Sequence, residues 1–162
     1  MSITLRSAEL FDVPLVFRRP MQTAISTLTV RRTTILRLTD SEGRIGYGEG
    51  VAFDTPWYTS ETQHSLQGIA QLLYELLEPP LHHPADVTDR FRIVQGNPMA
   101  KAMFEGAVYE LFAVPPGNRL LRTSEVTSQP SFLVGKHSDG HQQNKRSKLS
   151  VKPLPPDMDG SS

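Results

Sequence analysis

Residues 27–50, TLTVRRTTILRLTDSEGRIGYGEG, contain the clearest strand and turn signals in this chain. The first part of this stretch, residues 27–39, is rich in Thr, Val, Ile and Leu, a composition typical of a β-strand. Residues 40–43, Asp-Ser-Glu-Gly, have turn chemistry, and residues 44–48 return as another β-rich run. Two such runs joined by a short turn that contains Gly predict an antiparallel hairpin.

The residues before this hairpin predict one more strand and a long connection. A short apolar run ends near Pro14 and contains Ile3, Leu5, Ala8 and Leu10. The fifteen residues that follow, 14–28, are expected to form a loop, and structureless loops of that length are usually functional. As a lid over a neighbouring active site, the loop would present Met21, Thr23, Ile25 and Ser26. The alternative is a flexible connection with Phe17 in the core.

The residues after the hairpin predict a first helix. Ser60 and Gln63 have the spacing of a capping box, and Pro79-Pro80 stops the apolar pattern that follows. The apolar positions at helical spacing are Leu66, Ile69, Ala70, Leu73, Leu76 and Leu77.

Two further helices follow. One begins near Ala85 and ends at Gly96, with Val87, Phe91 and Val94 on one face. The next starts with Asn97 as N-cap and Pro98 in the first turn, and Pro115-Pro116 ends it. Its apolar residues are Met99, Ala102, Met103, Gly106, Val108, Leu111 and Phe112. We therefore predict an α+β fold, a three-stranded antiparallel sheet followed by three helices that pack on one sheet face.

Composition divides the 162 residues into two unlike parts. Residues 1–113 carry 10 basic and 13 acidic side chains, whereas residues 114–162 carry 7 basic and 4 acidic ones and only 11 apolar residues among 49. We therefore predict a folded domain over 1–113 and a low-complexity, largely disordered tail over 114–162. The tail's basic residues lack interleaved aromatics, so nucleic-acid binding is not expected.

Length and residue types exclude several classes of protein. The chain is shorter than the roughly 250 residues of a complete (β/α)₈ barrel. It has no Cys, which excludes disulfides, thiolate zinc sites and a cysteine nucleophile. It also shows neither a membrane span nor a signal-peptide core, so we expect a cytoplasmic protein that binds no membrane.

Catalytic and metal motifs are weak. No G-x-S-x-G elbow is present, and the glycines of residues 43–50 lie within a predicted strand rather than before a helix, which argues against a phosphate loop. The adjacent His82 and His83 do not readily share one metal. Glu49 is either a functional carboxylate or, as we favour, a hydrogen-bond acceptor in a loop.

An aromatic loop, residues 48–58, lies between the hairpin and the first helix. It carries Phe53, Tyr58 and Trp57, the only Trp in the sequence. These side chains form either a hydrophobic plug on their own domain or a surface for a ligand or second domain. The residue types alone favour the plug, because Trp and Phe are more often buried than exposed.

Four linked motifs carry a resemblance to a known family. They are GYGEGVA at 46–52, PWYTSE at 56–61, GNPMAKA at 96–102 and the A-x-x-x-L pattern at 107–111. Together they resemble the N-terminal capping domain of the enolase superfamily, in the branch that contains o-succinylbenzoate synthase and N-acylamino acid racemase. The resemblance covers residues 1 to about 113.

The resemblance implies a role for the two loops. In this family they close over the mouth of a C-terminal (β/α)₇β barrel and shape substrate specificity. Trp57 then becomes a pocket or lid residue instead of a plug. The substrate-specificity residues that the resemblance implies are Met21, Thr23, Ile25, Phe53, Trp57 and Tyr58.

The family's catalytic groups are missing from the recognisable part of the chain. Its lysines remove a proton alpha to a carboxylate, and Mg²⁺ stabilises the enediolate. Residues 148–153, KLSVKP, resemble the catalytic-lysine strand, but Ser150 stands where the second Lys belongs, so they are a coincidence or the remnant of a disrupted gene. We therefore expect no catalytic residue, no metal ligand and no cofactor in this chain, with Mg²⁺ confined to full-length relatives.

The expected function follows from the missing catalytic residues. Full-length relatives dehydrate a cyclohexadiene carboxylate in menaquinone biosynthesis or racemise N-acylated amino acids, a lyase and an isomerase activity respectively. We expect a truncated protein of this group, with a lid but no barrel, that is inactive alone. The alternative is a non-enzymatic interaction module that uses the exposed lid face. The expected partner is a barrel domain or another protein at that face, and without one a homo-oligomer or aggregate.

Overall fold

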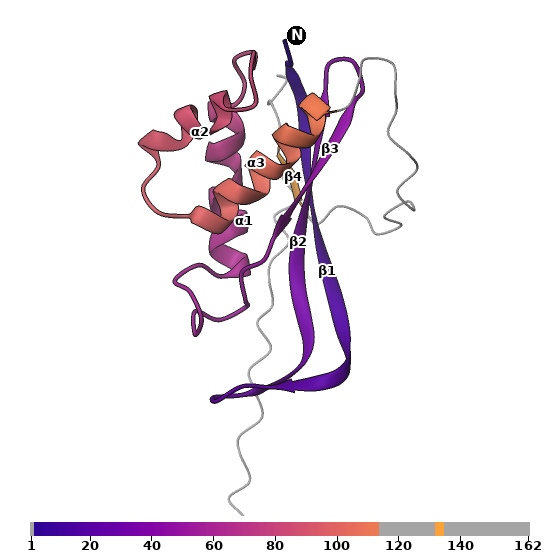
Figure 1. Ribbon diagram of the computed structural model, residues 1–162, viewed down its shortest axis with the longest axis vertical. Coiled ribbons are helices and arrows are strands. Elements are labelled where there is room, and N and C mark those ends of the chain that lie inside the picture. Colours follow the sequence, from indigo (N-terminus) through magenta and orange to yellow (C-terminus); the bar gives the residue numbers. More distant parts are fainter. Residues whose placement is uncertain (1, 114–131, 135–162) are drawn as a thin grey trace, which may run out of the picture.

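One antiparallel sheet, covered on one face by the helices, forms the domain (Figure 1). The computed structural model describes residues 2–113 and 132–134. The strands are β1 (Leu5–Gln22), β2 (Thr27–Asp40), β3 (Ile45–Gly50) and β4 (Phe132–Val134). The helices are α1 (Gln63–Leu76), α2 (Asp86–Arg90), a 3₁₀ turn (Phe91–Ile93) and α3 (Pro98–Ala113). The predicted α+β fold, with three strands followed by three helices, is confirmed.

The sheet has the strand order β3-β2-β1-β4. The hairpin predicted at residues 27–50 is β2 and β3, which pair from Thr34↔Gly50 to Thr39↔Ile45. The short strand β4 pairs with Ala8–Leu10 of β1 and was not predicted, since these residues lie in the expected tail. The other residues of that tail, 114–131 and 135–162, lie outside the described part of the chain.

The predicted fifteen-residue loop at 14–28 is wrong, because β1 continues to Gln22 and only residues 23–26 connect it to β2. Pro14 pairs with Arg32 and does not end the strand. A strand with a neighbour on one side tolerates proline, and β4 reaches β1 only at Ala8–Leu10. A register shift follows Val16, and Phe17 lies beyond it, half-buried instead of in the core.

The cap of α1 lies two residues after the predicted one. Thr62 is the N-cap, and its side chain accepts a hydrogen bond from the Ser65 amide at 3.1 Å. Ser65 Oγ in turn accepts one from the Thr62 amide at 2.9 Å. The predicted capping box of Ser60 and Gln63 does not form. The Gln63 side chain is buried, and its Nε2 donates a hydrogen bond to the Gly50 carbonyl at 3.1 Å.

Helix α3 lies directly on β3. A Cβ added to Gly46 or Gly48 would overlap the backbone carbonyl oxygen of Ala107 or Met103. Glycine is therefore needed at these positions for close packing of helix on strand. The buried residues of α3 are Ala100, Met103, Phe104, Ala107, Val108 and Leu111. Ala102 and Gly106, both predicted on this face, are exposed.

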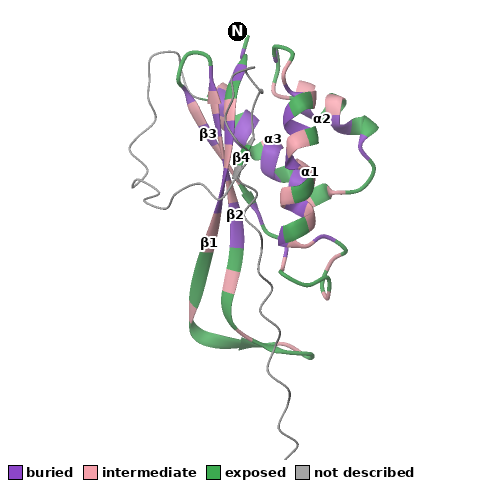
Figure 2. Ribbon diagram, turned by 180° about the vertical axis from the view of Figure 1, so that it is seen from behind, coloured by how far each residue is buried: buried purple, intermediate pink, exposed green. Residues whose placement is uncertain are grey.

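The core fills the space between the sheet and the helices (Figure 2). Val87, Phe91 and Val94 are buried there as predicted, and the rings of Phe91 and Phe104 meet edge to face at 6.2 Å. By contrast, the far half of the β1–β2 hairpin extends past the helices and is mostly exposed. We call this part, residues 14–31, the hairpin arm. Among the residues that the structure describes, no helix is long and apolar enough to cross a membrane.

Candidate functional site

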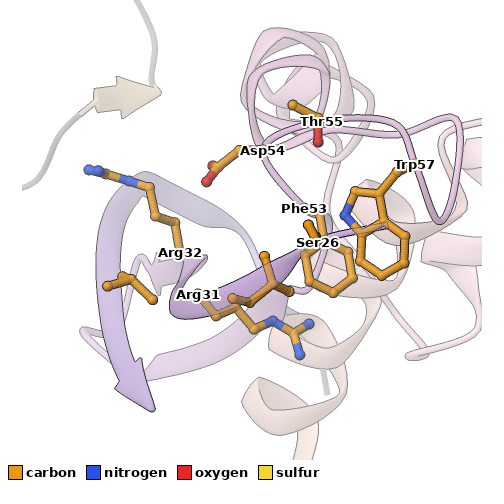
Figure 3. Close-up of a pocket in the computed structure, with 9 residues that line it drawn as sticks. Ser26, Arg31, Arg32, Phe53, Asp54, Thr55 and Trp57 are labelled. Atoms are coloured by element: carbon orange, nitrogen blue, oxygen red, sulfur yellow. The ribbon is translucent and has the colours of Figure 1, made fainter. Parts of the chain in front are cut away.

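A pocket of about 250 Å³ lies where the hairpin arm meets the aromatic loop (Figure 3). The arm and the adjoining part of β2 contribute Ser26, Leu28, Val30, Arg31 and Arg32 to its wall. The aromatic loop contributes Phe53, Asp54, Thr55 and Trp57. The site therefore combines the aromatic loop with a segment that begins at the end of the predicted 14–28 loop and continues into the predicted strand.

The aromatic side chains form a cluster beside the pocket. The ring centroids of Phe53 and Trp57 are 4.8 Å apart, and Tyr58 lies 6.1 Å from Phe53 and 5.6 Å from Trp57. The Phe53 carbonyl accepts a hydrogen bond from the Gln63 amide at 2.9 Å, which ties the loop to the start of α1. Trp57 is half-buried and lies outside the core cluster, so the plug favoured by sequence physics does not describe it.

Two arginines of β2 lie in the pocket wall in different settings. Arg32 forms an ion pair with Asp12 at 2.6 Å, and hydrogen bonding to this carboxylate raises the pKa of the guanidinium. Arg31 donates from Nη2 to the Val51 carbonyl at 2.8 Å, and its Cζ lies 5.1 Å from the Phe53 ring centroid. The Arg31 side chain is therefore held between a backbone carbonyl and an aromatic face.

The tip of the hairpin arm is a closed turn. The Thr23 amide donates to the Ser26 carbonyl at 2.8 Å, and the Ser26 amide donates to Thr23 Oγ1 at 3.0 Å. Thr23 therefore fixes the turn, whereas Met21 and Ile25 present exposed side chains there. None of these three residues lines the pocket.

Of the six predicted specificity residues, Phe53 and Trp57 line the pocket, and Tyr58 joins them through its ring. Leu28, Val30 and Arg31 also line the pocket, although no sequence motif marks them. These residues belong to β2 and its pairing with β1, so only recognition of the longer hairpin would have placed them beside Trp57.

Two glutamates near the site have structural partners. Glu49 accepts a hydrogen bond from Thr33 Oγ1 at 2.9 Å, so it is an acceptor as favoured, although it lies in β3 and not in a loop. Glu61 is only 5% exposed and accepts from the amides of Met99 and Ala100 at 2.8 and 3.1 Å. It thereby satisfies free amides at the first turn of α3, a role the sequence analysis missed.

The described residues contain no candidate metal centre. No three His, Asp or Glu side chains within residues 2–113 and 132–134 come together to hold an ion.

The backbone amides of His82 and His83 donate to Asp86 Oδ2 at 2.8 and 3.1 Å, and these bonds lower the pKa of Asp86. The donor set of this domain therefore does not fit the Mg²⁺ that the resemblance implies for full-length relatives.

The sheet and the three helices match the N-terminal capping domain of enolase-superfamily proteins. A superfamily member from Listeria innocua superposes with a TM-score of 0.65 and 36% identity, over 68% of this chain and 30% of that one. An Enterococcus faecalis member gives a TM-score of 0.64 and 32% identity, over 70% of this chain and 31% of that one.

At the level of sequence, the chain is similar to o-succinylbenzoate synthases. It is 35% identical over 115 residues to that of Geobacillus kaustophilus, which covers 70% of this chain and 31% of the relative. The match to the Listeria innocua o-succinylbenzoate synthase, also 35% identical, extends over 148 residues, 90% of this chain and 39% of the relative. The N-succinylamino acid racemase of Thermus thermophilus is 34% identical over 125 residues, 74% of this chain and 32% of the relative. The chain thus spans about a third of the length of these relatives. No protein-family profile matches it.

Proposed function

We propose that this chain supplies the lid part of an enzyme of the o-succinylbenzoate synthase or N-acylamino acid racemase type. The observation that carries the proposal is the pocket, in which Phe53 and Trp57 of the aromatic loop face Leu28 and Val30 of the hairpin arm. Such a pocket on a capping domain suits contact with the variable part of a substrate held at a barrel mouth. The setting proposed with it is cytoplasmic menaquinone biosynthesis or turnover of N-acylamino acids.

Each predicted specificity residue receives a proposed role. Phe53 and Trp57 form the apolar wall against the substrate, with Tyr58 at its rim. Thr23 holds the arm's tip closed, so that Met21 and Ile25 reach toward the barrel mouth. Removal of the alpha proton and binding of Mg²⁺ belong to the barrel, and this chain is proposed to be inactive by itself.

The test is a chimera in which residues 1–113 replace the capping domain of the Geobacillus kaustophilus enzyme. We expect the purified chain with Mg²⁺ to show no turnover of the relative's substrate and the chimera to show measurable turnover. A chimera carrying Trp57→Ala should keep its far-UV circular dichroism but lose much of its kcat/KM, with Leu72→Ala on the exposed face of α1 as the matched control. Turnover by the chain alone, or a folded but inactive chimera, would contradict the proposal.

A second candidate function is a non-enzymatic module that binds another protein through the lid face. The exposed apolar side chains of the hairpin arm favour it, among them Val16, which is 77% exposed, and Ile25, which is 66% exposed. Under this alternative the folded chimera stays inactive, and a Val16→Asp substitution abolishes complex formation with the partner while the chain's melting temperature is unchanged.

A further inference from the structure

Gln63, the first residue of α1, is only 6% exposed, and both ends of its side-chain amide are hydrogen-bonded. Its Nε2 donates to the carbonyls of Arg32, Gly50 and Ala52 at 3.2, 3.1 and 2.5 Å. Its Oε1 accepts from Thr34 Oγ1 at 2.5 Å. An amide nitrogen carries two protons, so three acceptors converge on one donor group. An apolar side chain at this position would deprive these carbonyls of that donor, which is unfavourable in a buried site.

These bonds join the two walls of the pocket. Arg32 lines the pocket from β2, and Ala52 directly precedes Phe53, which lines it from the aromatic loop. The backbone amide of Gln63 also donates to the Phe53 carbonyl at 2.9 Å. Figure 3 shows Phe53 and Trp57 on the loop side of the pocket and Arg32 on the strand side. Gln63 itself does not line the pocket, so it acts there through the residues that it holds.

The rest of the aromatic loop is held largely by its own contacts. The Trp57 amide donates to the Thr55 carbonyl at 3.0 Å, and the Trp57 ring packs on that of Phe53 at 4.8 Å. Contacts within a loop do not fix its position relative to the strands. Arg31 adds an exposed bond from β2 to the Val51 carbonyl, whereas the Gln63 bonds are buried and shielded from competing water.

We propose that Gln63 is a positioning residue, which fixes the aromatic loop against β2 and thereby sets the separation of the two pocket walls. The consequence for substrate selection rests on the proposed function above, whereas the position of the loop is a property of the isolated chain. The two proposals therefore fail separately.

The first experiment compares Gln63→Met with Gln67→Met in the full chain. Methionine is similar in length to glutamine and has no N–H donor. Gln67 lies one turn later on α1 and donates to Thr34 Oγ1 at 3.0 Å, so its replacement also removes a hydrogen bond but none to the loop. The readout is acrylamide quenching of the fluorescence of Trp57, the only Trp of the chain. We expect the quenching constant to rise roughly twofold in Gln63→Met, because local opening exposes the half-buried ring, and to stay unchanged in Gln67→Met.

A role in stability alone predicts a different result, in which both variants melt at a lower temperature and neither changes the quenching below its transition. The chimera described above supplies a second readout. In it, Gln63→Met should raise KM several-fold with kcat nearly unchanged, because a displaced loop weakens binding in the ground state and the transition state alike. Gln67→Met should change neither constant.

A third measurement covers poor folding of Gln63→Met and uses the unaltered chain. The Nε2 protons of Gln63 should be protected from exchange with water as well as its backbone amide is, because the same opening of the loop exposes both. Unprotected Nε2 protons beside a protected backbone amide would overturn the inference. So would unchanged quenching in Gln63→Met, equal quenching in the two variants, or an unchanged KM in an active chimera.

The outcomes also separate the two proposals. An active chimera combined with unchanged quenching in Gln63→Met defeats only the positioning role. An inactive chimera combined with increased quenching defeats only the lid function.

Discussion

At the residue scale, Glu61 shows how one side chain joins two parts of the domain. It follows the aromatic loop, yet its carboxylate accepts hydrogen bonds from the first turn of α3, some 38 and 39 residues later in the chain. The amides of a helix N-terminus have no partner within the helix, and a carboxylate placed there also interacts favourably with the helix dipole.

Replacing Glu61 with Ala should destabilise the domain by about 2 kcal/mol, because it removes two charge-assisted bonds and leaves buried amides without acceptors. Urea unfolding followed by circular dichroism measures the change. Glu75→Ala is the control, since Glu75 is exposed and bonds Gln71 of its own helix. Equal stability of the two variants would show that the contacts to α3 contribute little.

The hydrogen bonds to Asp86 predict a pH dependence in the loop before α2. They lower the folded-state pKa of this carboxyl below its unfolded value. Their stabilising effect is therefore complete above the unfolded pKa and is lost as the pH falls through the folded one. In an NMR titration, the amide shifts of His82 and His83 should move together at a pH below the ordinary aspartate pKa. The transition should disappear in Asp86→Asn, and its persistence there would exclude this carboxyl as the cause.

At the element scale, sequence patterns predicted the type and order of the helices and of β1 to β3, but not the true length of the β1–β2 hairpin. The apolar alternation at Leu36 and Leu38 reports a strand with one face against the core. Residues 14–31 contribute no buried side chain to the core, so this part of the hairpin has no hydrophobic periodicity to read. The pocket was only partly predictable, because Arg31 reaches the Val51 carbonyl and the Phe53 ring through tertiary contacts beyond the end of β3.

At α1 and α3, tertiary contacts explain why the structure differs from the predicted cap and the predicted apolar face. Gln63 matches a capping-box position, but its side chain bonds the buried carbonyls around β3 instead. Ala102 fits an apolar helical face but is exposed, whereas Ala107, which was not predicted there, packs against the strand, because Gly46 and Gly48 admit the backbone of α3. A single-element pattern does not contain the position of that neighbouring strand.

Replacing glycine by alanine is expected to have opposite effects on stability at Gly48, in the contact between β3 and α3, and at Gly68, on the open side of α1. Gly48→Ala should destabilise the domain by about 3 kcal/mol or more, because the new methyl group meets the Met103 backbone carbonyl and helix and strand must separate. Gly68→Ala in α1 has open space around its Cβ and should stabilise the domain by about 0.5–1 kcal/mol through helix propensity. Thermal unfolding of both variants checks the pair, and a mild effect at Gly48 would contradict such close packing.

At the scale of the whole molecule, the described part combines a closed core with an arm whose apolar side chains are exposed. Val16, Ile25 and Val30 are 77, 66 and 43% exposed, and all lie on the hairpin arm. Clustered exposed apolar groups favour association, and here they lie on the part of the domain that the helices do not cover.

We expect the isolated chain to self-associate, with an apparent mass in sedimentation that increases with protein concentration. Substituting Val16 and Ile25 with Thr should shift it toward monomer without lowering the melting temperature, since neither side chain is in the core. Leu72→Thr, on the exposed side of α1, serves as the comparison. A monomer at every concentration, before any substitution, would contradict this prediction.

The hairpin arm consists of two paired stretches, and between Val16↔Val30 and Met21↔Leu28 four residues of β1 lie opposite Thr29 alone. Within a paired stretch the ribbon lengthens only when both strands grow together, whereas the irregularity accommodates extra residues in one strand. Each added pair advances the tip by about 3.3 Å, and a single added pair also turns the tip's side chains to the opposite face. Within a paired stretch, reach and facing are preserved together only in steps of two pairs, about 7 Å each. The reach of the arm is therefore expected to change in discrete increments within its paired stretches, and in single residues only at the irregularity after Val16.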